Sequence, residues 1–131
     1  ADNHLLQGKG ETILLVEDEI AILELGRLLL TELNYNVLAA NTPEEAITMA
    51  TNHQGKIDLL ITDVIMPQMN GKELARQISQ LCPGTRCIYM SGYTADIIDR
   101  HGILDDGLDF IHKPFNIQQL AHKVYEVLHS S

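Results

Sequence analysis

The sequence predicts an α/β fold in which helices cover both faces of a five-stranded parallel sheet. Five short apolar runs alternate with five stretches of helical periodicity, and this βα alternation is typical of a doubly wound sheet. For a sheet of five strands the common order is 2-1-3-4-5, which gives a flavodoxin-like (βα)5 architecture. The chain has 131 residues, 45% of them hydrophobic, which suits a single domain with one sheet.

The strands are expected over residues 12–16, 35–40, 57–62, 87–90 and 109–112. The first and third are unbroken apolar runs, which indicates burial on both faces, whereas Asn36 makes the second typical of an edge strand. A helix is expected after each strand, and the stretch over residues 94–101 has the weakest apolar face. Periodicity predicts the inward positions Ile22, Leu25, Leu29 and Leu33 in the first helix and Leu74, Ile78 and Leu81 in the third.

Two helix starts carry the residue pattern of a capping box. Thr42 is followed by Pro43 and, three residues after the cap, by Glu45, which together form a capping box. Asn116 precedes the last helix with Gln119 at the corresponding position. These signals place the starts of the second and fifth helices.

Composition excludes several classes of function. The net charge of −9, from 18 acidic against 9 basic residues, argues against direct nucleic-acid binding. No apolar run approaches the ~20 residues that span a membrane, and no signal peptide is visible, so a cytoplasmic domain without membrane contact is expected. Residues 1–10 are polar and contain Gly8 and Gly10, so we expect a flexible lead-in or linker stub before a domain over residues 11–131.

Polar side chains follow the strands at one predicted edge of the sheet. Glu17 and Asp18 follow the first strand, Asp63 the third, Ser91 the fourth and Lys113 the fifth. The carboxyl ends of parallel strands form the edge where ligands bind, and strands 1 and 3 are neighbours at the switch point. Three carboxylates there repel one another unless a cation such as Mg²⁺ joins them. Taken singly, each acid is more often a helix cap or a structural residue; the joint arrangement is the functional signal.

These residues lie in motifs that resemble the response-regulator receiver domain of two-component signalling, over about residues 11–129. The motifs are residues 14–19 (LLVEDE), 63–67 (DVIMP) with Gly71 following, 90–92 (MSG) and 110–115 (FIHKPF). The resemblance implies Asp63 as phosphoacceptor and Lys113 as the lysine that contacts the phosphoryl group. It implies a Mg²⁺ site, in which Mn²⁺ is also possible, made by Glu17, Asp18, Asp63 and the backbone carbonyl of Ile65. It also implies a cis Lys113-Pro114 bond.

The resemblance further implies how the domain switches. Ser91 corresponds to the switch hydroxyl and Phe110 to the switch aromatic, although plain core packing also explains Phe110. Phosphorylation is expected to change the surface formed by helix 4, strand 5 and helix 5. Ile65 and Tyr93 occupy positions that tune dephosphorylation, and their bulk predicts a long-lived phosphoryl group.

The implied partners are a histidine kinase or histidine phosphotransfer domain as phosphodonor, and a downstream protein. No stand-alone enzyme is expected beyond self-phosphorylation and autodephosphorylation. The motifs look most like those of a receiver at the C-terminus of a hybrid sensor histidine kinase, a parent protein that can be attached to a membrane. A stand-alone response regulator is the other context. Two alternatives remain: an aspartyl-phosphate phosphatase, which Ile65 disfavours because a second acid is usual there, and a pseudo-receiver that only docks.

Overall fold

The five strands form one parallel sheet in the predicted order. In the computed structural model, residues 6–92 and 108–130 are described, and the sheet order is β2-β1-β3-β4-β5. The strands are β1 (Thr12–Val16), β2 (Asn36–Ala40), β3 (Leu59–Asp63), β4 (Arg86–Ser91) and β5 (Phe110–His112). The bounds of β1 match the sequence prediction, and those of the other strands differ from it by at most two residues. The doubly wound (βα)5 prediction is confirmed for the strands and for the four helices that are described.

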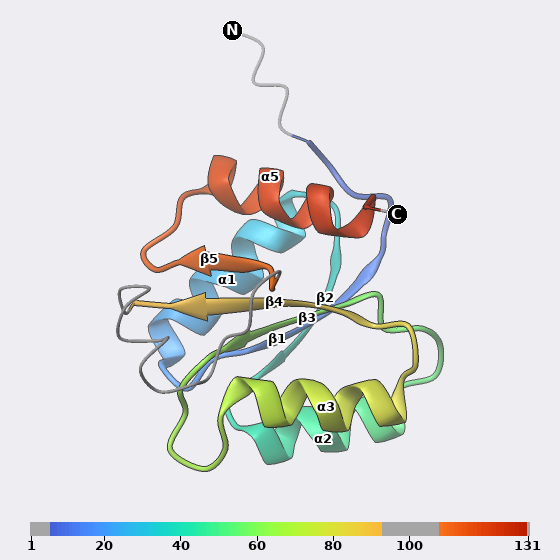
Figure 1. Ribbon diagram of the computed structural model, residues 1–131. Helices are drawn as coiled ribbons and strands as arrows, with labels where there is room; N and C mark the ends of the chain where they lie inside the picture. The colour runs from blue at the N-terminus through green and yellow to red at the C-terminus, as the bar shows by residue number, and fades with distance from the viewer. Residues whose placement is uncertain (1–5, 93–107, 131) are drawn as a thin grey trace, which may run out of the picture.

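The helices cover the sheet on both faces, as Figure 1 shows. They are α1 (Ile20–Glu32), α2 (Pro43–Asn52), α3 (Gly71–Leu81) and α5 (Ile117–Leu128). Helices α1 and α5 contact each other on one face, and α2 and α3 contact each other on the opposite face. The helix expected over residues 94–101 lies outside the described residues. None of the described helices is long and apolar enough to cross a membrane.

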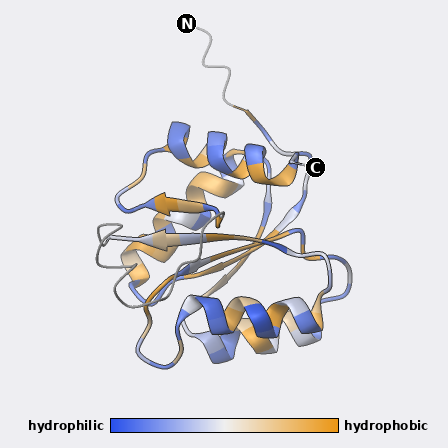
Figure 2. Ribbon diagram, in the orientation of Figure 1, coloured by the Kyte–Doolittle hydropathy of each residue, from blue (hydrophilic) through white to orange (hydrophobic). Residues whose placement is uncertain are grey.

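The sheet separates two apolar layers. Successive strand residues point to opposite faces, so Ile13 and Leu15 of β1 pack toward α1 and α5, whereas Leu14 and Val16 pack toward α2 and α3. β3 is buried along its whole length, while β2 is only partly buried, as expected for an edge strand. Figure 2 shows the apolar strands between the two helix layers.

The predicted inward face of α1 is partly wrong. The helix buries Leu23, Gly26 and Leu30, together with Leu33 just after its end, whereas Leu25 is 46% exposed. The helix is apolar nearly all round, so its periodicity fits more than one face. Gly26 lies on the buried face, where a Cβ would be only 2.9 Å from Leu15 Cδ2, and its missing side chain lets the helix seat closely on β1.

Leu81 was also predicted to point inward but is 45% exposed. It is the last residue of α3, where the helix ends and the chain turns back toward β4. Leu74 and Ile78, the other two predicted positions, are fully buried. Asn116 and Gln119 form the predicted capping box. The box predicted at Thr42 is only half formed: the Thr42 side chain accepts from the Glu45 amide, but the Glu45 side chain accepts from the Asn41 amide and not from the Thr42 amide.

The segment before β1 packs on the domain from Gly8 onward. The Gly8 amide donates to the Leu33 carbonyl at 2.8 Å, and the Gly10 amide donates to the Asn34 carbonyl at 3.0 Å. The Asn34 side chain donates back to the Gly8 carbonyl at 2.8 Å. Gly8 lies against the ring of Tyr35, so close that an added Cβ would be 2.2 Å from Cε1. We refer to residues 8–10 as the N-terminal strap.

Candidate functional site

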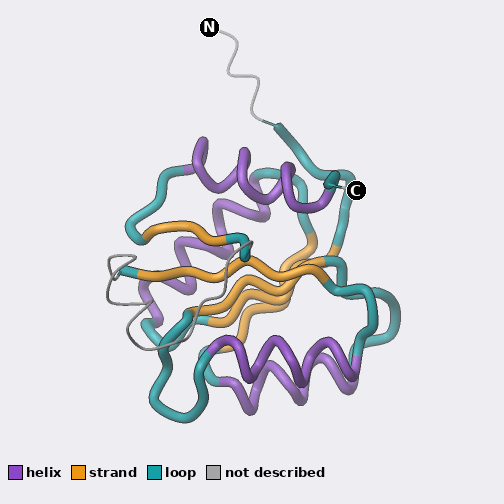
Figure 3. Tube along the Cα trace, viewed as in Figure 1, coloured by secondary structure: helices purple, strands orange, loops and turns teal. Residues whose placement is uncertain are grey.

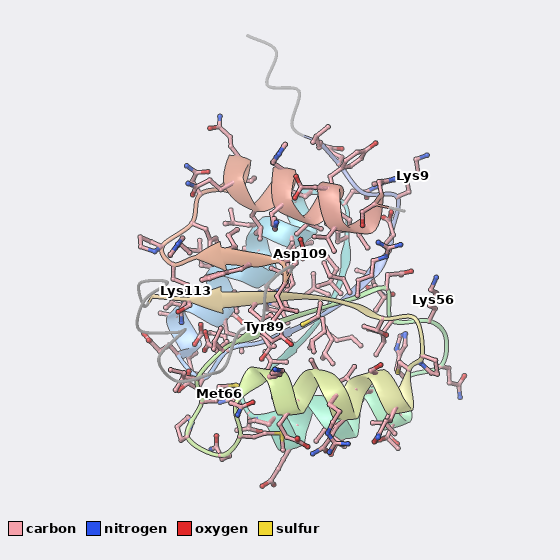
Figure 4. All side chains as sticks on the ribbon, viewed as in Figure 1. Lys9, Lys56, Met66, Tyr89, Asp109 and Lys113 are labelled. Atoms are coloured by element: carbon pink, nitrogen blue, oxygen red, sulfur yellow. The ribbon has the colours of Figure 1, made fainter. Side chains whose placement is uncertain are left out.

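The carboxyl ends of the strands bring the predicted site residues to one edge of the sheet. Val16 is in register with Thr62, and Asp63 with Met90, so the residues after β1 lie beside the end of β3. Ser91 ends β4 in register with His112, and Lys113 follows. Figure 3 shows that the loops after β1, β3 and β5 leave the sheet at the same end. Figure 4 places Lys113 at this end, with Lys9 and Lys56 at the other.

Three carboxylates meet at this edge. Glu17, Asp18 and Asp63 each offer an oxygen, and these oxygens lie within 4.8 Å of one another. Glu17 and Asp63 are buried, whereas Asp18 is exposed. The group therefore has a buried side and a side open to solvent.

Lys113 bridges the two buried carboxylates. Its Nζ donates to Asp63 Oδ1 at 2.7 Å and to Glu17 Oε1 at 2.9 Å. The second oxygen of Glu17 accepts from the Glu19 amide at 2.9 Å. The second oxygen of Asp63, Oδ2, is buried and has no hydrogen-bond partner among the described residues. Asp63 is thus oriented through one oxygen while the other remains available.

The electrostatics of the edge follow from this burial. Burial, with a smaller contribution from the neighbouring Glu17, raises the pKa of Asp63 from 3.8 to about 8, although Lys113 acts in the opposite direction. Burial disfavours the charge on Lys113, but the two carboxylates outweigh it and raise the pKa of the lysine. One cation shared between two buried anions leaves the edge short of positive charge.

The donor set fits a hard divalent cation. Mg²⁺ prefers carboxylate and carbonyl oxygens and keeps several waters. The unpartnered Oδ2 of Asp63 is a buried acceptor that a cation would satisfy, and the exposed Asp18 keeps the position open to water. Glu17, Asp18 and Asp63 are the described residues that could hold such an ion.

The remaining predicted residues surround this group. Ser91 is buried, and its carbonyl accepts from the Lys113 amide at 2.9 Å. Ile65 is half-buried in the loop between β3 and α3, and Phe110 is half-buried on β5; both pack against Val64 and Tyr89. The Lys113-Pro114 peptide is cis, as the resemblance implied. Tyr93 lies outside the described residues.

A cleft opens beside Lys113 on the α1 side of the site. It has a volume of about 430 Å³ and is lined by Glu19, Ile22, Leu25, Gly92, Lys113, Pro114 and Phe115. Most of its lining is apolar, apart from Glu19 and Lys113. Lys113 is therefore reached from solvent between α1 and the loop that follows β5.

Sequence reasoning missed one polar side chain that supports the site. Thr62 is fully buried beside Asp63, and its hydroxyl donates to the Asp63 carbonyl at 3.1 Å. In the sequence Thr62 reads as an ordinary β-branched strand residue. A hydroxyl next to the acid within an otherwise apolar run was the only signal that could have identified it.

The matching family model describes the response regulator receiver domain and covers residues 13–125. The chain belongs to the response regulator receiver domain family. It is therefore a receiver domain of two-component systems. Receiver domains bind Mg²⁺ through an acidic cluster, and Glu17, Asp18 and Asp63 form such a cluster here.

Two curated relatives illustrate the family. The receiver domain is 37% identical to the sensor kinase CckA of Brucella abortus over 117 residues. The aligned region covers 89% of this chain and 12% of the kinase. The receiver domain is 35% identical to the response regulator ArlR of Staphylococcus aureus, covering 88% of this chain and 52% of the regulator. The chain thus spans a small part of the first relative and about half of the second.

Solved structures of receiver domains have the same fold as this chain. The receiver domain of the hybrid histidine kinase CckA superposes with a TM-score of 0.75 at 36% identity, covering 90% of this chain and 99% of that one. A CheY-like receiver domain from Methanospirillum hungatei JF-1 superposes with a TM-score of 0.75 at 30% identity, covering 91% and 94%.

Proposed function

We propose that this receiver domain is a phosphorylation switch that takes a phosphoryl group from a partner phosphohistidine onto Asp63, in a Mg²⁺-dependent reaction. The observation that carries the proposal is the state of the Asp63 carboxylate. One of its oxygens is held by Lys113 at 2.7 Å, and the other is buried and unpartnered among the described residues. A nucleophile needs this combination of a fixed orientation and an oxygen free to react.

The proposed transfer is a displacement at phosphorus. An Asp63 oxygen forms a bond to phosphorus while the bond from phosphorus to the donor imidazole nitrogen breaks, and the electron pair leaves with the imidazole. The phosphohistidine carries a proton on its other ring nitrogen, so the products are an acyl phosphate on Asp63 and a neutral histidine on the partner. When bound, Mg²⁺ neutralises charge on the phosphoryl oxygens.

The residues of the chain supply the rest of the chemistry. Lys113 offers an ammonium beside Asp63, which stabilises the added negative charge of roughly −2. Ser91 lies at the end of the neighbouring strand, close enough in register to respond to a group on Asp63. Ile65 stands at the loop after β3, where its bulk shields the acyl phosphate from water.

The proposed output is a change in the surface that comprises β5, α5 and the helix expected over residues 94–101. Movement of Ser91 toward the phosphoryl group alters the space around Phe110, which is half-buried on β5. A hollow of about 280 Å³ between β5 and α5 is lined by Phe110, Ile111, His112, Gln119, His122 and Lys123. The aromatic ring thus borders a surface whose shape it can change.

The proposed partners are a histidine kinase or histidine phosphotransfer domain and a downstream protein. The similarity to the receiver of a hybrid kinase supports a hybrid sensor histidine kinase as the parent protein; a stand-alone regulator is the second context. In either context the domain is proposed to act in the cytoplasm without contacting a membrane or nucleic acid.

Incubation with Mg²⁺ and acetyl phosphate, followed by intact mass measurement, tests the proposal. Wild-type protein should gain one phosphoryl adduct, and Asp63→Asn should gain none. Asp58→Asn is the matched control, since Asp58 lies at the opposite end of β3 and accepts from the Thr12 amide at 2.9 Å; its adduct should equal that of the wild type.

Each other outcome points to a different function. No adduct on wild-type protein contradicts the switch and favours a docking pseudo-receiver. Rapid hydrolysis of varied phosphomonoesters favours an aspartyl-phosphate phosphatase instead. An adduct that persists in Asp63→Asn places the phosphoacceptor elsewhere.

A further inference from the structure

Gly71, the first residue of α3, lies in unusually close contact with the backbone of Asp63. A Cβ at this position would be 2.1 Å from the Asp63 carbonyl oxygen and 3.1 Å from its carbonyl carbon. It would also lie 3.2 Å from Thr62 Cγ2. Two of these three atoms belong to the backbone and cannot rotate away. Only glycine lets α3 approach the end of β3 this closely.

The same carbonyl is held from within the strand. The Thr62 hydroxyl donates to the Asp63 carbonyl at 3.1 Å. The Gly71 amide donates to the Val64 carbonyl at 2.7 Å, and the Val64 amide donates to the Met90 carbonyl at 3.0 Å. The backbone around Asp63 is therefore fixed on the side of α3 and on the side of β4.

We propose that Gly71 and Thr62 are positioning residues for the phosphoacceptor. Together they fix the Asp63 backbone, and through it the direction in which the carboxylate leaves the strand. They also fix the two ends of the loop over residues 64–70, which carries Ile65. The inference rests on the proposed function, since it concerns the geometry in which Asp63 binds a cation and accepts a phosphoryl group.

The size of the effect follows from the distances. Ordinary contact begins at 3.4 Å, so a Cβ 2.1 Å from the Asp63 oxygen requires a movement of about 1.3 Å. The movement must be made by the end of β3, which carries Asp63, or by the start of α3, which anchors the loop that carries Ile65. Misplacement of about 1 Å in a reacting group can cost on the order of 10²-fold in rate.

Gly26 provides a matched control. It is also a buried helical glycine, but the nearest atom to its added Cβ is Leu15 Cδ2 at 2.9 Å, the far end of a flexible side chain. It lies on the α1 face of the sheet, against a side chain of β1 and not against the backbone of β3. Gly26→Ala should therefore change packing without changing the site.

The experiment compares wild type, Gly71→Ala, Thr62→Val and Gly26→Ala. Melting temperatures are measured in EDTA and in saturating Mg²⁺, and the rate of phosphorylation by acetyl phosphate is measured by intact mass. Gly71→Ala should be phosphorylated at least about tenfold more slowly and lose most of the Mg²⁺-dependent rise in Tm. Thr62→Val, which keeps its shape but loses the hydroxyl, should show the same changes to a smaller degree. Gly26→Ala should keep both responses.

The outcomes separate this inference from the proposed function. If wild type is not phosphorylated, the proposed function fails. The positioning role of Gly71 is contradicted if wild type is phosphorylated and Gly71→Ala matches it in phosphorylation rate and in Mg²⁺-dependent rise in Tm. It is also contradicted if Gly71→Ala and Gly26→Ala lose the phosphorylation rate and the Mg²⁺ response to the same degree. If Gly71→Ala does not fold, Thr62→Val decides: an unchanged rate and Mg²⁺ response overturn the inference.

Discussion

Replacing Asp63 with Asn should stabilise the domain in the absence of Mg²⁺. The variant keeps the shape of the side chain and an oxygen that can accept from Lys113, but it cannot ionise. In the wild type, burial raises the pKa of the Asp63 carboxyl from 3.8 to about 8. The folded protein therefore holds a carboxyl that resists ionisation, whereas the unfolded chain ionises it freely. Stability from this group is present below about pH 3.8 and is lost as the pH rises through about 8.

The magnitude follows from the same pKa. Each pKa unit corresponds to ~1.4 kcal/mol, so the penalty rises from about 2 kcal/mol near pH 5 to about 5 kcal/mol near pH 8. These values are upper limits, because small backbone shifts and entering water relieve part of the penalty. We expect Asp63→Asn to raise the free energy of unfolding by about 2–3 kcal/mol near pH 8, which is a rise in Tm of about 5–10 °C.

Thermal and urea unfolding in EDTA, near pH 5 and near pH 8, measure this effect. The gain of Asp63→Asn over wild type should be larger at the higher pH. Saturating Mg²⁺ should reduce the gain, because the ion stabilises wild type by ~1.4 kcal/mol for each tenfold excess over its dissociation constant. Asp58→Asn is the control and should show no gain, because Asp58 already has the Thr12 amide as a partner. The reasoning is refuted if Asp63→Asn is no more stable than wild type near pH 8 in EDTA.

Four further predictions test other parts of the structure. Lys113→Met should lower the free energy of unfolding in EDTA by about 3 kcal/mol, because two buried carboxylates lose their shared cation. This expectation is contradicted if Lys113→Met has the same urea midpoint as Lys113→Arg. Asn116→Ala should cost about 1 kcal/mol through loss of the capping box, with Asn116→Asp restoring it; an unchanged urea curve would show that the cap contributes nothing. Cys87 is half-buried, and this burial raises the pKa of its thiol to about 12, so iodoacetamide should label it far more slowly in the folded protein than in urea, as measured by peptide mapping; equal labelling rates in the two states contradict this. Ile65→Asn should shorten the half-life of the acyl phosphate, and an equal half-life by intact mass rules out shielding by Ile65.

The sequence predicted the sheet and the gathering of the site residues because both depend on short-range pattern. An apolar run that ends in Asp63 identifies a buried strand and its carboxyl end together, and the strand order then brings Glu17 and Lys113 to the same edge. The face of α1 could not be predicted in this way. Its sequence is apolar on several sides, and the buried face is the one on which Gly26 closely approaches Leu15, a contact between distant positions.

The fine geometry of the site was equally beyond sequence reasoning. Lys113 was expected beside a phosphoryl group, but its bridge between Asp63 and Glu17 depends on how far the loop after β5 reaches over the edge. Gly71 was recognised only as part of a motif. Its role against the Asp63 carbonyl depends on the seating of α3, which no pattern along the chain records.

The N-terminal strap has a consequence for how the domain can be joined to other polypeptides. The strap binds the turn between α1 and β2, and the side chain of Arg86, the first residue of β4, donates to the Val127 carbonyl and the Ser130 hydroxyl at the end of α5. Both anchoring points lie where strands start, roughly 16 Å from the phosphoacceptor by the length of a five-residue strand. A fusion partner or fluorescent reporter joined to the strap or after α5 therefore leaves the route to Asp63 unobstructed. A short rigid joint would hold the added protein at the edge of the sheet opposite Asp63.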